Sequence, residues 1–188
     1  MDRAIEKVKE RLLRAAAALR LAGVPYAVVG GNAVAAWVSR VDEAAVRNTR
    51  DVDLLLRRVD LAAAKQALEA AGFHYRQVAM PGQGGTQDVF LDGADAKVRD
   101  AVHILWAGEH VKSDSPEPSP DVTAAEDAGG FQLIGLPELV RMKLSSFRDK
   151  DRMHLRDLID ADLVDASWPS ELPAILAARL RWLLENTE

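Results

Sequence analysis

The sequence of 188 residues contains no cysteine, and only 5% of its residues are aromatic. Without cysteine the chain has no disulfide framework and no thiolate zinc site. No apolar run approaches the roughly 20 residues that span a bilayer, and the N-terminal segment lacks the basic and then apolar layout of a signal peptide. These absences predict a cytoplasmic protein that does not enter a membrane.

An excess of positive charge is also lacking. The chain has 24 Lys and Arg against 29 Asp and Glu, which gives a net charge of −5. Because general nucleic-acid binding depends on clustered cations that neutralise phosphates, this balance argues against a nucleic-acid coat protein, although a local basic groove is compatible with it. The hydrophobic fraction of 48% is ordinary for a globular protein, and the length allows a substantial core.

Hydrophobic periodicity and turn residues predict both helices and strands. We expect strands at residues 26–29, 51–56, 74–79, 87–91, 101–106 and 131–134. We expect helices at residues 3–22, 31–39, 60–71, 136–148 and 149–158 and a last one from 170 onward, with Asp60 and Ser170 as N-caps. Residues 81–86 are expected to form a hairpin-like loop, and the polar, proline-punctuated residues 110–130 a long surface loop that covers a site or carries a partner surface.

One short segment has the composition of a phosphate-binding turn. The apolar stretch from Tyr26 to Val29 leads into Gly30-Gly31-Asn32 and then into a helical pattern. Glycine has no Cβ, so the backbone N–H groups of such a turn can approach a phosphate closely, and the positive end of the following helix adds to the attraction. The turn therefore predicts a site for the phosphates of a nucleotide.

A second segment has the composition of a metal site. Asp51 and Asp53 are two residues apart at the start of an apolar strand, so their side chains point to the same face, roughly 6.6 Å apart along the strand. Two carboxylates so placed repel each other and favour a shared cation, and Mg²⁺ prefers hard oxygen ligands. Asp51 and Asp53 are thus expected to bind a divalent metal.

The order of these motifs resembles the nucleotidyltransferase superfamily that is built around the DNA polymerase beta-like catalytic core. The motifs are Gly30-Gly31-Asn32, then a helix, then Thr49-Arg50-Asp51-Val52-Asp53-Leu54. The spacing is most similar to that of the minimal bacterial enzymes, both toxin-like and antibiotic-modifying, and the resemblance covers roughly residues 24–165. It implies an α+β fold in which a small mixed sheet is flanked by helices. Residues 1–135 would form the catalytic core, and residues 136–188 a C-terminal helical segment packed on it.

The resemblance also implies an activity, namely the metal-dependent transfer of a nucleoside monophosphate from a nucleoside triphosphate (NTP) to a hydroxyl acceptor. The acceptor is a small molecule, an RNA or a protein, and the cofactor is Mg²⁺ or Mn²⁺. The metal ligands and catalytic acids would be Asp51 and Asp53. The residues implied to bind the nucleotide are Gly30, Gly31, Asn32, Thr49, Arg50 and Lys143.

The third acid of the family's metal site has no counterpart. On the expected strand at residues 101–106 its position holds His103, while Asp100 lies at the mouth of the strand with the opposite parity. His103 has three alternative roles: a metal ligand, a base for the acceptor hydroxyl, or a hydrogen-bonded core histidine. If neither residue replaces the acid, the chain is a weakly active or non-catalytic nucleotide-binding module of the toxin–antitoxin type, with a protein partner.

Lys143 is the other residue that the pattern singles out, because it falls within an apolar helical stripe. Leu139, Val140, Leu144 and Phe147 surround it at helical spacing. A lysine there is paired, reaches to solvent, or serves a site. In the resembling family a lysine in this context contacts the phosphates, and the alternative is an ion pair with Asp151 or Asp157 in an otherwise structural charged helix.

Overall fold

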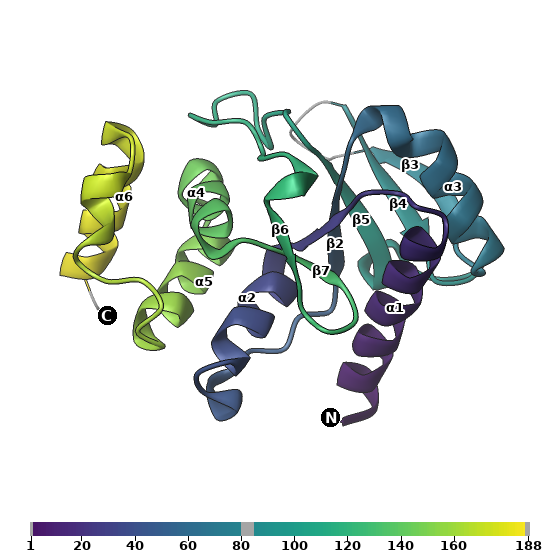
Figure 1. Ribbon diagram of the computed structural model, residues 1–188, viewed down its shortest axis with the longest axis horizontal. Helices are drawn as coiled ribbons and strands as arrows, with labels where there is room; N and C mark the ends of the chain where they lie inside the picture. The colour runs from purple at the N-terminus through teal and green to yellow at the C-terminus, as the bar shows by residue number, and fades with distance from the viewer. Residues whose placement is uncertain (1, 80–84, 187–188) are drawn as a thin grey trace.

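A computed structural model of the chain describes residues 2–79 and 85–186, with side chains from residue 5 onward (Figure 1). Its centre is a seven-stranded mixed sheet with the strand order β3-β4-β5-β2-β1-β7-β6. The strands are β1 (Ala27–Val29), β2 (Val52–Leu56), β3 (His74–Ala79), β4 (Thr86–Leu91), β5 (Ala101–Trp106), β6 (Ala125–Asp127) and β7 (Gln132–Ile134). The pairs β1–β7 and β2–β5 are parallel, and the other pairs are antiparallel. The predicted α+β class with a mixed sheet is confirmed.

Six helices cover the two faces of this sheet. They are α1 (Asp2–Leu21), α2 (Gly30–Ser39), α3 (Leu61–Ala70), α4 (Leu136–Ser146), α5 (Asp149–Asp160) and α6 (Ala174–Glu185). Helices α1 and α3 lie on one face, α2, α4 and α5 on the other, and α6 packs on the outer side of α4 and α5 (Figure 1). None of these helices is both long enough and apolar enough to cross a bilayer. The predicted division at residue 135 falls between β7 and α4 and stays a prediction.

Alternation along the central strand β2 decides where the acids lie. Leu54 and Leu56 pack into the core under α1 and α3, whereas Leu55 packs into the core under α2 and α4. Successive side chains of a strand point to opposite faces, so Asp53 shares the face of Leu55. Strand β2 therefore directs the Asp53 carboxylate to the face that α2 and α4 cover.

Two local predictions are wrong. The short strand β6 lies within the predicted loop at residues 110–130, and its sequence Ala-Glu-Asp carries no alternating apolar signal. Ser170 belongs to a 3-10 turn and does not cap the last helix, which begins at Ala174 directly after Pro173. Asp60 occupies the predicted N-cap position of α3, although its side chain accepts no hydrogen bond from the helix. Most of the loop predicted at residues 81–86 lies outside the described residues.

The two faces of the fold give a matched test of core packing. Leu55 is fully buried and Leu21 is 86% exposed. We expect Leu55→Ala to lower the free energy of unfolding by about 2–5 kcal/mol, since it removes buried apolar surface and leaves a cavity. Leu21→Ala is expected to change it by less than about 0.5 kcal/mol. Urea titration of both variants measures the difference, and equal costs would contradict the described burial of Leu55.

Candidate functional site

The glycine turn fits against the carboxylate of Asp53. Val29 of β1 pairs with Asp53 of β2, and the next residue, Gly30, has a φ of +67°. A Cβ at Gly30 would overlap the Asp53 carboxylate. Glycine is required here on two grounds, because the backbone lies in the left-handed region and because the acid occupies the space of a side chain. Gly30 thus serves to admit Asp53, in addition to its predicted role toward phosphate.

The neighbouring residues hold the backbone of the second acid, Asp51, in place. The Asn32 side-chain amide donates to the backbone carbonyl of Asp51 at 2.6 Å, and the Thr49 hydroxyl donates to the same oxygen at 3.4 Å. A Cβ at Gly31 would lie 3.0 Å from Thr49, so the second glycine allows this close approach. The amide of Asn32 therefore positions the backbone that carries Asp51.

The remaining predicted nucleotide ligand of this segment, Arg50, has a different placement. Its backbone carbonyl accepts from Arg11 at 3.2 Å, and its side chain is exposed. Arg50 does not line the cleft that contains Asp53; it lines a second cavity on the other side of Asp51. Its predicted role at the phosphates stays a prediction.

The predicted metal ligands Asp51 and Asp53 lie close to positively charged lysines. Burial raises the pKa of Asp53, while the positive charges of Lys143 and Lys150 act in the opposite direction. Lys150 is 3.6 Å from the Asp51 carboxylate, a loose pair between two partly exposed side chains. The two carboxylates supply hard oxygens of the kind that Mg²⁺ and Mn²⁺ prefer. Within residues 2–79 and 85–186 no group of three or more His, Cys, Asp or Glu side chains is placed to hold a metal.

His103 lies beside Asp53, as the sequence predicted for the position of the third acid. The two residues are register partners in the parallel pair β2–β5, and both side chains line the cleft. The His103 Nε2 atom is 3.0 Å from the carbonyl of Val98. A carbonyl oxygen only accepts, so Nε2 carries the proton and Nδ1 is the basic nitrogen of the neutral ring. Asp100 does not line the cleft and lies 3.7 Å from Arg99, so it does not replace the missing acid.

Lys143 forms the ion pair that was one of its predicted alternatives. Its Nζ atom donates to Asp151 at 3.0 Å, and both side chains are buried. Burial lowers the pKa of Lys143, and the negative charges of Asp151 and Asp53 oppose this effect. The same lysine lines the cleft that contains Asp53. The ion pair and a contact with phosphates are therefore compatible roles.

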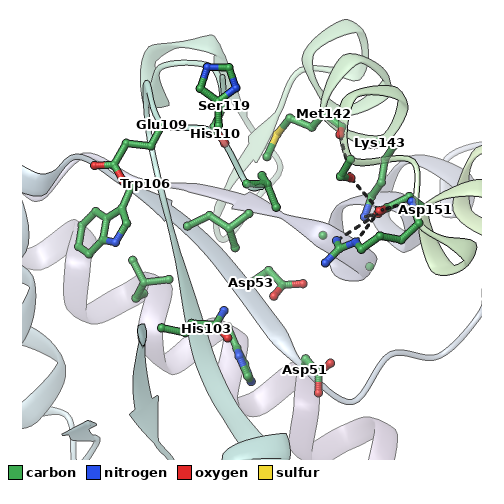
Figure 2. A pocket seen from close by; sticks show the side chains of 18 of the residues that line it. Asp51, Asp53, His103, Trp106, Glu109, His110, Ser119, Met142, Lys143 and Asp151 are labelled. Atoms are coloured by element: carbon green, nitrogen blue, oxygen red, sulfur yellow. Dashed lines mark hydrogen bonds and ion pairs between the residues drawn. The ribbon is translucent and has the colours of Figure 1, made fainter. Parts of the chain in front are cut away.

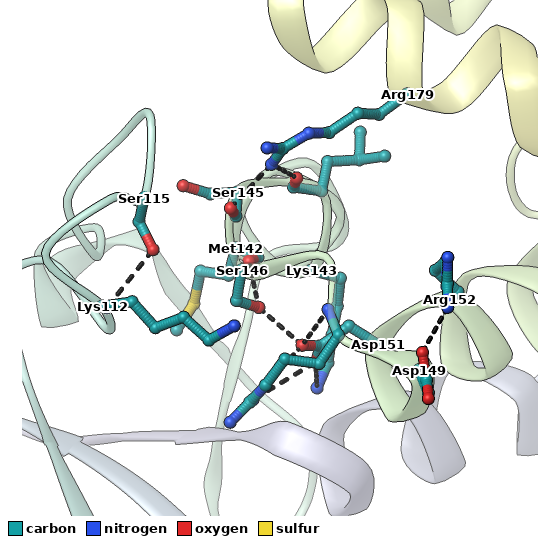
Figure 3. A network of polar contacts seen from close by, with 12 residues as sticks. Lys112, Ser115, Met142, Lys143, Ser145, Ser146, Asp149, Asp151, Arg152 and Arg179 are labelled. Atoms are coloured by element: carbon teal, nitrogen blue, oxygen red, sulfur yellow. Dashed lines mark hydrogen bonds and ion pairs between the residues drawn. The ribbon is translucent and has the colours of Figure 1, made fainter. Parts of the chain in front are cut away.

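Asp151 is the centre of the polar network that holds this lysine (Figure 3). It also accepts from the Ser146 hydroxyl at 2.7 Å and from the Arg148 guanidinium at 2.7 Å. Although burial acts to raise it, these hydrogen bonds and the charge of Lys143 hold the pKa of Asp151 well below its usual range. A buried carboxylate with this many donors fixes the end of α4 against the start of α5.

The site lies in a cleft of about 430 Å³ that runs from the α4–α5 network across Asp53 to the end of β5 (Figure 2). At its far end the Trp106 indole donates to the buried Asp88 at 3.2 Å. Arg58 lies over the Trp106 ring at 4.5 Å and pairs with Glu109. The cleft is thus cationic at one end and lined by acids and an aromatic ring at the other.

The long loop after β5 forms a wall of this cleft. Glu109, His110 and Ser119 line it, and the backbone closes on itself through a hydrogen bond from the Ser119 N–H to the Glu109 carbonyl at 2.8 Å. Glu117 fastens the loop to α4, because it accepts two hydrogen bonds from Arg141 at 2.8 and 3.1 Å. The predicted loop thus covers part of the site and is held in place by α4.

Several residues of the site were not singled out by the sequence analysis. The sequence pattern offers Asp151 only as an alternative partner for Lys143 within a structural charged helix. It marks Arg148 only as the end of one expected helix and Lys150 as part of the next. All three line the cleft. A signal was present, since Arg148, Lys150 and Asp151 follow Lys143 closely and sit at the junction of two helices. The far wall with Trp106 and Asp88 had no comparable signal, because strand pairing brings it together.

Replacing each of two glycines that share one backbone conformation separates strain from steric overlap. Gly23 and Gly30 both have a φ of +67°, but a Cβ at Gly23 meets nothing within 4 Å. We expect Gly23→Ala to cost about 1–2 kcal/mol of the free energy of unfolding, from backbone strain alone. Gly30→Ala is expected to cost more, since it also displaces Asp53. Thermal or urea unfolding compares the two, and an equal cost would show that Asp53 does not depend on the space at Gly30.

His154 provides a test that depends on pH. It is buried on α5 with its Nδ1 unpartnered, and burial, with Lys143 and Lys150, lowers its pKa to about 3. In the unfolded chain the His154 imidazole takes up a proton near pH 6.5. The contribution of the neutral, buried His154 to the free energy of unfolding is therefore fully present above that pH and is lost as the pH falls toward 3. We expect the free energy of unfolding to fall by about 2 kcal/mol more between pH 7.5 and pH 5.0 in the wild type than in His154→Gln. Urea titrations at the two pH values measure this, and parallel pH dependence would contradict the assignment.

Comparisons with known proteins find no matching family and a distant likeness to two solved structures. A scan of protein-family models gives no match, and neither does a search of curated proteins. Two solved structures of the antibiotic-resistance factor ANT(2'')-Ia are similar to this chain. The solution structure has a TM-score of 0.44 at 15% identity and covers 93% of this chain and 81% of that chain. The crystal structure in complex with adenylyl-2''-tobramycin has a TM-score of 0.45 at 17% identity, with 93% and 86% covered. These values describe a distant likeness in the arrangement of the elements.

Proposed function

We propose that the chain is a nucleotidyltransferase that moves a nucleoside monophosphate from an NTP to a hydroxyl acceptor, with Mg²⁺ or Mn²⁺ as cofactor. The observation that carries the proposal is the position of Asp53 on β2. It lies between Gly30, which directly follows β1, and His103 of β5. Asp51 is held beside it through the Asn32 amide. A metal bound by Asp51 and Asp53 would offset negative charge on the attacking and leaving oxygens.

The cationic end of the cleft suits the leaving group. In the transfer the acceptor oxygen forms a bond to the α-phosphorus, the bond from this phosphorus to the bridging oxygen breaks, and pyrophosphate leaves. Lys143, Arg148 and Lys150 line the cleft at that end. They would bind the β- and γ-phosphates by charge, together with the backbone N–H groups at Gly30 and Gly31.

The opposite end of the cleft suits the acceptor. Figure 2 shows Trp106 and Glu109 on one side of Asp53, with Lys143 and Asp151 on the other. In-line displacement requires the attacking and leaving oxygens on opposite sides of the phosphorus, and this arrangement provides two such sides. The basic Nδ1 of His103 would take the proton of the acceptor hydroxyl, since Nε2 is already bound to Val98.

The second candidate function is a nucleotide-binding module without turnover, in the manner of a toxin–antitoxin partner. It is favoured by one observation: among the described residues no third acid completes the metal site. The two candidates agree on nucleotide binding and differ on transfer. The acceptor and any protein partner stay predictions under either one.

Nucleotide binding in the presence of Mg²⁺ or Mn²⁺ tests the shared part of both candidates. We expect Asp51→Asn and Asp53→Asn each to weaken the affinity for an NTP at least about tenfold, since each removes one carboxylate from the metal. Asp95→Asn removes the same charge from an exposed position and is expected to leave the affinity for an NTP unchanged. Calorimetric titration of the three variants gives the affinities, and unchanged binding in both site variants would refute the metal site.

Transfer itself is read from radiolabel. We expect label from α-³²P NTPs, and not from γ-³²P NTPs, on an acceptor in cell extract. His103→Ala is expected to lower the rate by a factor of about 10²–10⁴, the usual contribution of a general base, with little change in NTP affinity. Label from neither NTP would favour the non-catalytic module, and a loss of stability without a loss of rate would make His103 a core residue.

A further inference from the structure

A second cavity of about 610 Å³ lies on the other side of Asp51 from the cleft. It is bounded by α2, by the loop at residues 45–51 and by α5. Three residues line both spaces: Gly31, Asp51 and Lys150. A ligand in the cavity is therefore adjacent to the predicted metal and phosphate site.

The floor and rim of this cavity differ in chemistry. The floor on α2 is made of small or apolar side chains, and Met153 of α5 adds an apolar wall. The residues of this lining are Gly31, Val34, Ala35, Val38, Val46 and Met153. The rim carries the side chains of Arg47, Arg50 and Lys150. A flat apolar group joined to an anionic one matches such a surface.

Two side chains that line the cavity carry buried polar atoms without partners. His154 is 6% exposed, and its Nδ1 has no hydrogen bond; Asp157 is 9% exposed, and its Oδ2 has none. The other oxygen of Asp157, Oδ1, accepts from Arg47 at 2.7 Å. Buried polar atoms without partners are uncommon, and a carboxylate oxygen is satisfied by an N–H or O–H donor. A ligand in this cavity would be expected to bring donors.

The direction of transfer leaves one position for the nucleoside. The pyrophosphate would leave toward Lys143 and Arg148, and the acceptor would approach from Trp106, so these two groups occupy the two ends of the cleft. In an in-line displacement the nucleoside is attached to the α-phosphorus at right angles to that line. The second cavity opens beside Asp51, and of the residues named at the two ends only Lys150 also lines it.

We propose that the second cavity binds the base and ribose of the NTP, with the base against the α2 floor and its N–H or the ribose O–H groups directed to His154 and Asp157. The proposal rests on the nucleotidyltransferase function and adds the nucleoside subsite. Lys150, which lines both spaces, would contact the phosphates from the side on which the nucleoside lies.

The experiment compares ATP with inorganic tripolyphosphate, both with Mn²⁺, by calorimetric titration. Tripolyphosphate probes the phosphate and metal site alone, whereas ATP also probes the nucleoside subsite. We expect the wild type to bind ATP at least about tenfold more tightly than tripolyphosphate. Ala35→Phe, which fills the floor of the cavity, is expected to reduce this ratio to about two or less and to leave tripolyphosphate binding unchanged.

Controls keep the result interpretable. Ala63→Phe introduces the same side chain at an exposed position of α3, on the opposite face of the sheet, and is expected to retain the wild-type ratio. Met153→Trp fills the cavity from α5 and covers the case in which Ala35→Phe does not fold. A wild-type ratio near one, or a ratio that persists in both filled variants, would overturn the nucleoside subsite. If Asp51→Asn bound tripolyphosphate as tightly as the wild type, the proposed function would instead be refuted.

Discussion

The register of four neighbouring strands determines the position of the candidate site. Val29 pairs with Asp53, Asp53 with His103, and His103 with Val89, so one row of residues crosses β1, β2, β5 and β4. A shift of β2 or β5 by one residue would turn the Asp53 carboxylate or the His103 imidazole to the opposite face. The apolar neighbours oppose such a shift, because Leu54 and Leu56 would then have to leave the core under α1 and α3. The hydrophobic pattern of β2 thus fixes the polar site.

Charge balance is supplied from outside the sheet. Asp51 and Asp53 belong to the strand segment, whereas Lys143 and Lys150 come from two helices more than 80 residues later in the chain. Asp151 joins these helices through its buried pair with Lys143. Removing one member of a buried pair leaves an uncompensated charge, so the cationic end of the cleft is tied to the stability of the helical segment.

Local patterns were sufficient to predict most of the fold. Alternation and turn residues located six of the seven strands, and the glycine turn with Asp51 and Asp53 located one part of the candidate site. Strand β6 was missed because three residues with one apolar side chain carry no period. The start of α6 was misplaced because a serine followed by an acid resembles a cap, while Pro173 fixes the true start.

The rest of the site depends on tertiary contacts. Two contacts follow from the order of the strands, which a single sequence does not reveal. They are the hydrogen bond from Asn32 to the Asp51 backbone and the hydrogen bond from Trp106 to Asp88. The second cavity likewise arises from the packing of α5 against α2.

The fit of Gly30 against Asp53 has a consequence for evolution. Because the carboxylate fills the space that a side chain at Gly30 would need, the two positions are free to change only together or in one order. A descendant that kept Asp53 could not exchange Gly30 for another residue without moving the acid. A descendant that had first replaced Asp53 by a smaller residue would be relieved of the overlap, although the positive φ would still favour glycine. Loss of the glycine in a relative is therefore a marker that the acid was lost earlier.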